Sequence, residues 1–255
     1  MSGLWYPHVK EAPLQGLTGM WGGVGSNLVG GGPSQPGAPG DGVYVDENLF
    51  FRWDLAEYNY TAGQGSINDT SGNGRDGNIN NAIQNMWQST NHGRFNWSTN
   101  NQQTYINNNQ GSPQYSNGFT LEFWAQNETA SCSGLFDTAP NEVNTIRQYS
   151  PGGHVEWWSG SPTITMSMST QWAHYVVTAK LQAGNNRQLN TWKNGSVTAQ
   201  GTGSGPDRWN NYCVGVYNYG DPWEGYLGMT ACYNKVLNQS EIQQNYQALK
   251  HRYGL

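Results

Sequence analysis

The sequence is poor in charged residues and in cysteine. Asp, Glu, Lys and Arg make up only 11% of the 255 residues, and the formal net charge is −5. No run of Lys or Arg is present, so the phosphate-neutralising surface of a nucleic-acid-binding protein is missing and we expect no nucleic-acid partner. The odd number of cysteines does not fit a complete disulfide framework. We expect Cys132, Cys213 and Cys232 to be small buried residues, with one disulfide bridge as the alternative.

Long apolar runs are also missing. No stretch of about 18 uninterrupted apolar residues occurs, so we expect no membrane span. Near the amino terminus, Lys10, Glu11 and Pro13 interrupt the apolar residues, which is unlike a secretory signal peptide. We therefore expect the protein to be made and assembled in a cytosol.

The residue patterns of common catalytic sites are missing too. Glucanases place two carboxylates on one strand, two or four residues apart, so that both face the cleft. Glu122 and Glu156 have no carboxylate at this spacing, and a proline separates Asp137 from Glu142. The five histidines show no zinc spacing, and no glycine-rich phosphate loop is followed by Lys. We therefore expect a protein that is not an enzyme.

What the sequence does contain is many aromatic residues in a polar background. The chain has 12 Trp and 15 Tyr, which supply enough apolar surface to exclude a disordered chain. From Leu49 onward, short segments alternate apolar and polar residues, most clearly over 119–125, and clusters of Gly and Pro separate them. This pattern is typical of an all-β sandwich.

Two local signals near the end of the chain are specific. Asn194 and Gly195 lie between β-type residues and predict a type I′ hairpin turn. Asn238 is a suitable helix N-cap, and Glu241 follows three residues later. Apolar residues then recur at helical spacing, at Ile242, Tyr246, Leu249 and Tyr253. We predict one short C-terminal helix that docks on the sandwich.

The composition divides the chain into three parts. Residues 1–30 form a glycine-rich apolar arm, 31–48 a linker rich in Pro and Gly, and 49–255 the sandwich. We interpret the arm as an anchor for a partner, because an exposed apolar segment would otherwise be a liability. Packing of the arm on its own sandwich is the alternative. The expected anchoring residues are Leu4, Trp5, Leu14, Leu17 and Trp21.

The third part resembles the laminin-G-like domains of the concanavalin A-like jelly-roll superfamily. The resemblance is carried by DTSGNGRDG at 69–77, TYI at 104–106, FTLEFW at 119–124, QWAHYV at 171–176, WKNG at 192–195 and residues 225–237. It implies an all-β jelly-roll sandwich with one short C-terminal helix and an extended N-terminal arm. Where many relatives carry an acidic residue, residues 228–231 are GMTA, which argues against a metal or charge role for that strand.

The layout of the whole chain is similar to that of virion structural proteins of tailed bacteriophages. This resemblance implies a capsid decoration, head-fibre or tail-fibre component that is located in the virion. The arm would bind other capsid or tail proteins, the jelly roll would be displayed outward toward host-surface glycans, and we expect self-association into homo-oligomers. A secreted carbohydrate-binding or adhesion module is the alternative, and a degenerate glycan hydrolase is a third.

Aromatic residues are the candidates for glycan binding. Flat rings stack against the apolar faces of sugars, while amides and hydroxyls fix the orientation. Ordinary core or intersubunit packing of these aromatic residues is the alternative. The candidate glycan-binding residues are Trp158, Tyr217, Tyr219, Asp221 and Trp223.

Asp69 and Asp76 are candidate calcium ligands. They bracket the tight loop 71–74, and carboxylates with loop carbonyls suit a hard cation. In the alternative, Asp69 caps the turn, Asn73 and Gly74 adopt positive φ, and Asp76 accepts loop amides. Beyond this calcium, no cofactor is expected.

Overall fold

The computed structural model describes most of the sandwich. The described residues are 43–55, 65–81, 87–88, 92–95, 104–108, 118–128, 133–137, 144–149, 152–157, 163–183, 186–204, 212–217 and 221–255. The predicted arm, with Leu4, Trp5, Leu14, Leu17 and Trp21, lies outside them. No described helix is long and apolar enough to span a membrane.

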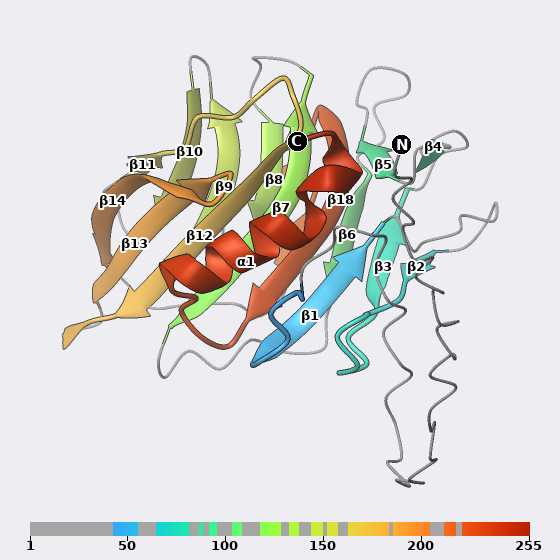
Figure 1. Cartoon of the computed structure of the whole chain (residues 1–255). Coiled ribbons are helices and arrows are strands. Elements are labelled where there is room, and N and C mark those ends of the chain that lie inside the picture. Colours follow the sequence, from blue (N-terminus) through green and yellow to red (C-terminus); the bar gives the residue numbers. More distant parts are fainter. Residues whose placement is uncertain are drawn as a thin grey trace, which may run out of the picture. The chain divides into compact units, whose positions relative to one another are not determined.

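The described strands form two sheets (Figure 1). The eight-stranded first sheet has the order β14 (Ser196–Ser204), β13 (Asn186–Lys193), β12 (Ala173–Leu181), β7 (Phe119–Asn127), β18 (Gly225–Tyr233), β5 (His92–Phe95) and β4 (Trp87–Gln88), with β1 (Leu49–Asp54) also paired to β18. The described pairings within this sheet are all antiparallel.

The ten-stranded second sheet has the order β11 (Thr163–Thr165), β10 (Gly152–Trp157), β9 (Asn144–Tyr149), β8 (Ser133–Asp137), β15 (Tyr212–Val214), β6 (Tyr105–Asn108), β3 (Gly77–Asn80) and β2 (Ser66–Ile67). A short hairpin of β16 (Val216–Tyr217) and β17 (Asp221–Pro222) lies beside β8, to which β17 makes a single parallel pairing. The predicted jelly-roll sandwich is confirmed.

The main core lies between the two sheets. Side chains alternate between the two faces of a strand, so Phe119, Leu121 and Phe123 of β7 enter this core. Phe123 packs against Phe136 of the second sheet, with 6.1 Å between ring centroids, and Tyr212 of the second sheet stacks on Phe51 of β1 at 5.0 Å. Cys232 is buried in the same core, and Cys213 is buried in the second sheet, as expected for small strand residues. Cys132 lies outside the described residues.

A second core lies on the opposite face of the first sheet. Helix α1 (Gln239–Leu249) and the 3-10 helix η2 (Lys250–Tyr253) follow β18, and α1 crosses the outer face of this sheet (Figure 1). Ile242 and Leu249 pack there with Trp124 of β7 and Val176 of β12. Both faces of β7 and β12 are therefore buried.

Both local signals at the end of the chain are confirmed. Asn194 and Gly195 have φ angles of 51° and 76° and connect β13 to β14. At the start of α1, the Asn238 side chain accepts a hydrogen bond from the Glu241 N–H (3.1 Å). The Glu241 side chain accepts one from the Asn238 N–H (2.9 Å), which completes a capping box.

Asn238→Ala tests how far this cap stabilises the fold. The variant leaves the Glu241 N–H without its acceptor, so we expect the free energy of unfolding to fall by about 1 kcal/mol. Urea denaturation followed by circular dichroism measures the change. Gln243→Ala, at an exposed position inside the helix, is the control and should be close to neutral. Equal stability of the two variants would contradict the role given to the cap.

Candidate functional site

The loop 69–76 hydrogen-bonds to the edge of β1. The Asp69 carboxylate accepts hydrogen bonds from the N–H groups of Arg52 (2.9 Å), Ser71 (2.9 Å) and Arg75 (3.0 Å), and from the Ser71 hydroxyl (2.7 Å). Asp76 accepts the N–H of Asp69 itself at 2.8 Å. The loop therefore uses its carboxylates as acceptors for its own backbone and for β1.

This geometry does not fit the proposed calcium site. Both oxygens of Asp69 already accept two hydrogen bonds each. Among the described residues, no cluster of three or more His, Cys, Asp or Glu side chains is arranged to hold a metal. The alternative of a hydrogen-bonded turn agrees with the structure, with one correction. Positive φ falls on Gly72 (82°) and Gly74 (67°) and not on Asn73, whose side chain instead donates to the Leu49 carbonyl (2.7 Å).

A buried polar network joins the first sheet to α1. Asn245 of α1 donates to Glu122 of β7 (2.8 Å) and to the Tyr233 hydroxyl (2.9 Å). Glu122 also pairs with His174 of β12 at 2.8 Å, and both side chains are fully buried. His174 stacks on the Trp124 ring, with 4.9 Å between centroids. His174 is therefore a packed, hydrogen-bonded residue, and the side chains of Glu122, His174 and Asn245 are all buried.

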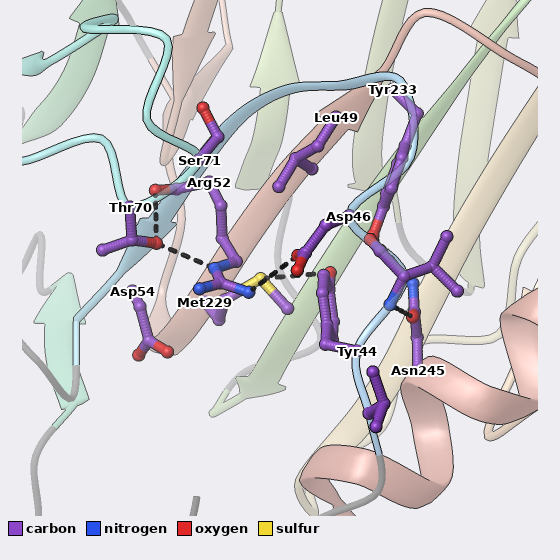
Figure 2. Close-up of polar contacts among 12 residues, drawn as sticks. Tyr44, Asp46, Leu49, Arg52, Asp54, Thr70, Ser71, Met229, Tyr233 and Asn245 are labelled. Atoms are coloured by element: carbon purple, nitrogen blue, oxygen red, sulfur yellow. Dashed lines mark hydrogen bonds and ion pairs between the residues drawn. The ribbon is translucent and has the colours of Figure 1, made fainter. Parts of the chain in front are cut away.

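The segment 43–47, here called the strap, is fastened to this network (Figure 2). The Val45 N–H donates to Asn245 (2.8 Å), and the Val45 carbonyl accepts from the Tyr233 hydroxyl (3.0 Å). Next to the strap, Arg52 lies between Thr70 (2.8 Å) and Asp46 (3.7 Å). The last part of the predicted linker is therefore packed on the sandwich.

The structure corrects one of the predicted glycan-binding residues. The Trp223 side chain is 0% exposed in the core between the sheets, and its ring N–H donates to the Tyr226 carbonyl (3.3 Å). Its ring is therefore not accessible to a sugar. Tyr217 and Asp221 lie directly opposite each other on β16 and β17. Trp158 and Tyr219 lie outside the described residues.

A different set of polar residues shares the outer face of the second sheet. Asn78 lies opposite Asn107, and Asn80 lies opposite Tyr105, across the β3–β6 pair. Ile79 and Ile106, the residues between them, point into the core, so the polar residues point outward. Ser66 of β2 lies opposite Asn78 and extends the row. We call this set the amide face: Ser66, Asn78, Asn80, Tyr105 and Asn107.

The amide face offers one aromatic ring and several hydrogen-bonding groups. Ser66 and Asn78 are exposed, and the other three residues are half-buried. Asn80 donates to the Asn107 side chain at 3.0 Å, which orients both amides. Burial raises the pKa of the Tyr105 hydroxyl, and the nearby Cys213 raises it further. The hydroxyl therefore stays protonated at neutral pH and is able to donate a hydrogen bond.

Asp69→Ala tests the loop as a hydrogen-bonded edge closure. The variant leaves the N–H groups of Arg52, Ser71 and Arg75 without this acceptor, so we expect a loss of about 1–3 kcal/mol in the free energy of unfolding. Thermal and urea denaturation measure it. Adding calcium to the wild-type protein, or removing it with a chelator, should leave the melting temperature unchanged. A calcium-dependent rise would contradict this account.

Comparison with known proteins places this fold in a family. Residues 99–243 match the family model of the Concanavalin A-like lectin/glucanases superfamily, in its Laminin_G_3 branch. That match covers more than half of the chain. No curated protein sequence matches the chain.

Several solved structures share the fold. The binding domain of botulinum neurotoxin DC, in complex with rat synaptotagmin II, is 12% identical, with a TM-score of 0.61 over 80% of this chain and 52% of that one. The same binding domain in complex with SialylT has a TM-score of 0.60, also at 12% identity and with the same coverage of both chains. Trypanosoma rangeli sialidase in complex with sialic acid is 13% identical, with a TM-score of 0.55 over 81% of this chain and 34% of that one.

The chain thus spans about half the length of the binding domains that it resembles. At these identities the likeness shows the fold alone. Together with the two stacked sheets and the family match, it shows that this chain belongs to the Concanavalin A-like lectin/glucanases superfamily.

Proposed function

We propose that the sandwich is a non-enzymatic carbohydrate-binding or adhesion module whose binding surface includes the amide face. The observation that carries this proposal is the outward row of Asn78, Asn80, Tyr105 and Asn107 on adjacent strands. Sugars are bound by rings that stack on their apolar faces and by amides that both donate to and accept from their hydroxyls. The amide face offers both kinds of group on a rigid sheet.

The chemistry of this face also supports a binding role without catalysis. Hydrolysis of a glycoside requires a general acid and a second carboxylate near the scissile bond. The five residues of the amide face include no carboxylate. Glu122, a carboxylate on the central strand β7, is fully buried and committed to His174 and Asn245.

Similar structures that hold sugar ligands add support. The botulinum neurotoxin DC binding domain is known in complex with SialylT, and the trypanosomal sialidase in complex with sialic acid. Because one fold hosts many functions, these ligands support glycan binding as a class. They do not identify the glycan that this chain binds.

Removing the ring of Tyr105 tests the proposal. We expect Tyr105→Ala to weaken binding of a glycan selected on a broad array by about tenfold or more, equivalent to about 1.4 kcal/mol, because the stacking surface is lost. Asn107→Ala should weaken it as well. Isothermal titration calorimetry measures both. Gln243→Ala, on the exposed side of α1, is the control and should bind as wild type. Failure of the wild-type protein to bind any arrayed glycan would contradict the proposal.

We further propose that the module is part of a bacteriophage virion, as a capsid decoration, head fibre or tail-fibre component. In this proposal residues 1–30 attach to capsid or tail proteins, and the sandwich is displayed outward. Two features support it: the glycine-rich apolar arm and the packing of the strap against α1. The strap holds the chain firmly to the sandwich where the linker ends.

Deleting residues 1–30 tests the anchor. We expect a folded sandwich that no longer incorporates into particles, because the strap and both cores stay intact. Particle incorporation is measured by mass spectrometry of purified virions. Tyr105→Ala in the full chain is the control and should incorporate normally. Normal incorporation of the truncated protein would contradict the anchoring role.

A further inference from the structure

The side-chain amides of Asn80 and Asn107 form a directed pair on the amide face. The Asn80 NH2 group donates to the Asn107 amide oxygen (3.0 Å) and to the Asn78 carbonyl (3.2 Å), so both of its N–H groups are used. Among the described residues, nothing bonds to the Asn80 amide oxygen or to the Asn107 NH2 group. The pair therefore offers a ligand one acceptor group and one donor group, and an internal hydrogen bond orients both.

Such a pair suits hydroxyl groups better than anionic groups. A hydroxyl both donates and accepts, so two hydroxyls of one sugar satisfy the Asn80 oxygen and the Asn107 NH2 group together. An ionised carboxylate only accepts, and so does a sulfate ester. Placed on the pair, an anionic group would accept from Asn107 but would have no hydrogen to offer to the Asn80 oxygen.

The described residues bring no positive charge to the amide face. Only two Lys or Arg residues among them belong to the second sheet or to a loop that leads into it, Arg75 and Arg147. The Arg75 guanidinium lies over the Phe50 ring, 3.8 Å from its centroid. Arg147 is on β9, which β8 and β15 separate from β6. Because the strong hydrogen bonds to anionic groups come from Arg and Lys, an anionic sugar would be desolvated here without a charged partner.

We propose that the amide face selects uncharged sugar residues and disfavours sugars that carry a carboxylate or a sulfate. The Asn80–Asn107 pair determines this specificity, whereas the Tyr105 ring supplies stacking surface for either class. The inference rests on the proposed function, because it requires that the amide face binds a glycan. It also distinguishes this chain from Trypanosoma rangeli sialidase, which shares the fold and is known in complex with sialic acid.

A glycan array tests the selectivity of the wild-type protein. The array carries each neutral oligosaccharide beside its sialylated and sulfated counterparts, so that the paired probes differ only in the anionic group. We expect the neutral members to bind at least about tenfold more tightly than their counterparts, as calorimetry on the best pair measures. The Kd of the neutral member should be the same in low and high salt, because no ion pair is screened.

The outcomes of the array separate this inference from the proposed function. An anionic member that binds as tightly as its neutral counterpart would overturn the selectivity and leave glycan binding intact. Binding to no member of the array would overturn both.

Asn78→Lys tests whether the missing positive charge sets the selectivity. The variant adds a cation to the amide face at an exposed position. We expect the ratio of sialylated to neutral binding to rise about tenfold, because the carboxylate gains a charged partner. Gln243→Lys adds the same charge on the exposed side of α1 and is the matched control, with the wild-type ratio. A wild-type ratio in Asn78→Lys would overturn the inference.

Asn107→Asp tests the amide pair itself. Aspartate has the shape of asparagine and still accepts from Asn80, but it replaces the free donor group by an acceptor. We expect binding of the neutral glycan to weaken about tenfold, with a circular dichroism spectrum that shows the variant to be folded. Gln243→Glu makes the same amide-to-carboxylate change on α1 and should bind as wild type. Full neutral-glycan binding by Asn107→Asp would contradict the role of the pair.

Discussion

The rest of the structure depends on the burial of β7 and β12 on both faces. Alternate residues of these strands serve two separate cores: Phe123 and Tyr175 pack against the second sheet, whereas Trp124 and Val176 pack under α1. A strand with period-two alternation normally leaves one face for solvent. Here the helix and the strap cover the outer face of the first sheet. The outer faces of β7 and β12 are therefore not available to a ligand.

The polar network under α1 fixes the positions of the helix and the strap on the first sheet. Burying the Glu122 carboxylate without partners would cost several kcal/mol. His174 and Asn245 both contact it, from β12 and from α1. The same Asn245 side chain accepts the Val45 N–H. One buried carboxylate therefore links a strand, the helix and the strap, and an altered position of any of them would leave buried polar groups unpaired.

Much of the fold was predictable from the sequence because its signals are local. The Asn194–Gly195 turn needs positive φ at both residues, and the Asn238 cap needs only a side chain three residues away from its partner. The hydrogen bonding of loop 69–76 to the edge of β1 was not predictable, because its partners Leu49 and Arg52 lie about 20 residues earlier in the sequence.

The candidate site was harder to predict. The Trp223 ring could stack on a sugar, but a large ring is equally suited to a core, and the structure buries it. The apolar–polar alternation around Trp223 is too short to predict which face of the strand its side chain occupies. The amide face was missed for another reason. Asn-Ile-Asn at 78–80 and Tyr-Ile-Asn at 105–107 each show alternation, yet only the sheet register brings the two segments side by side.

Backbone NMR shift mapping tests most directly whether the outer face of the second sheet is the binding surface. A glycan that binds the labelled protein should shift the amide signals of β2, β3 and β6, while the signals of β7 and β12 stay in place because α1 covers them. Shifts concentrated on α1 and the first sheet would contradict the account.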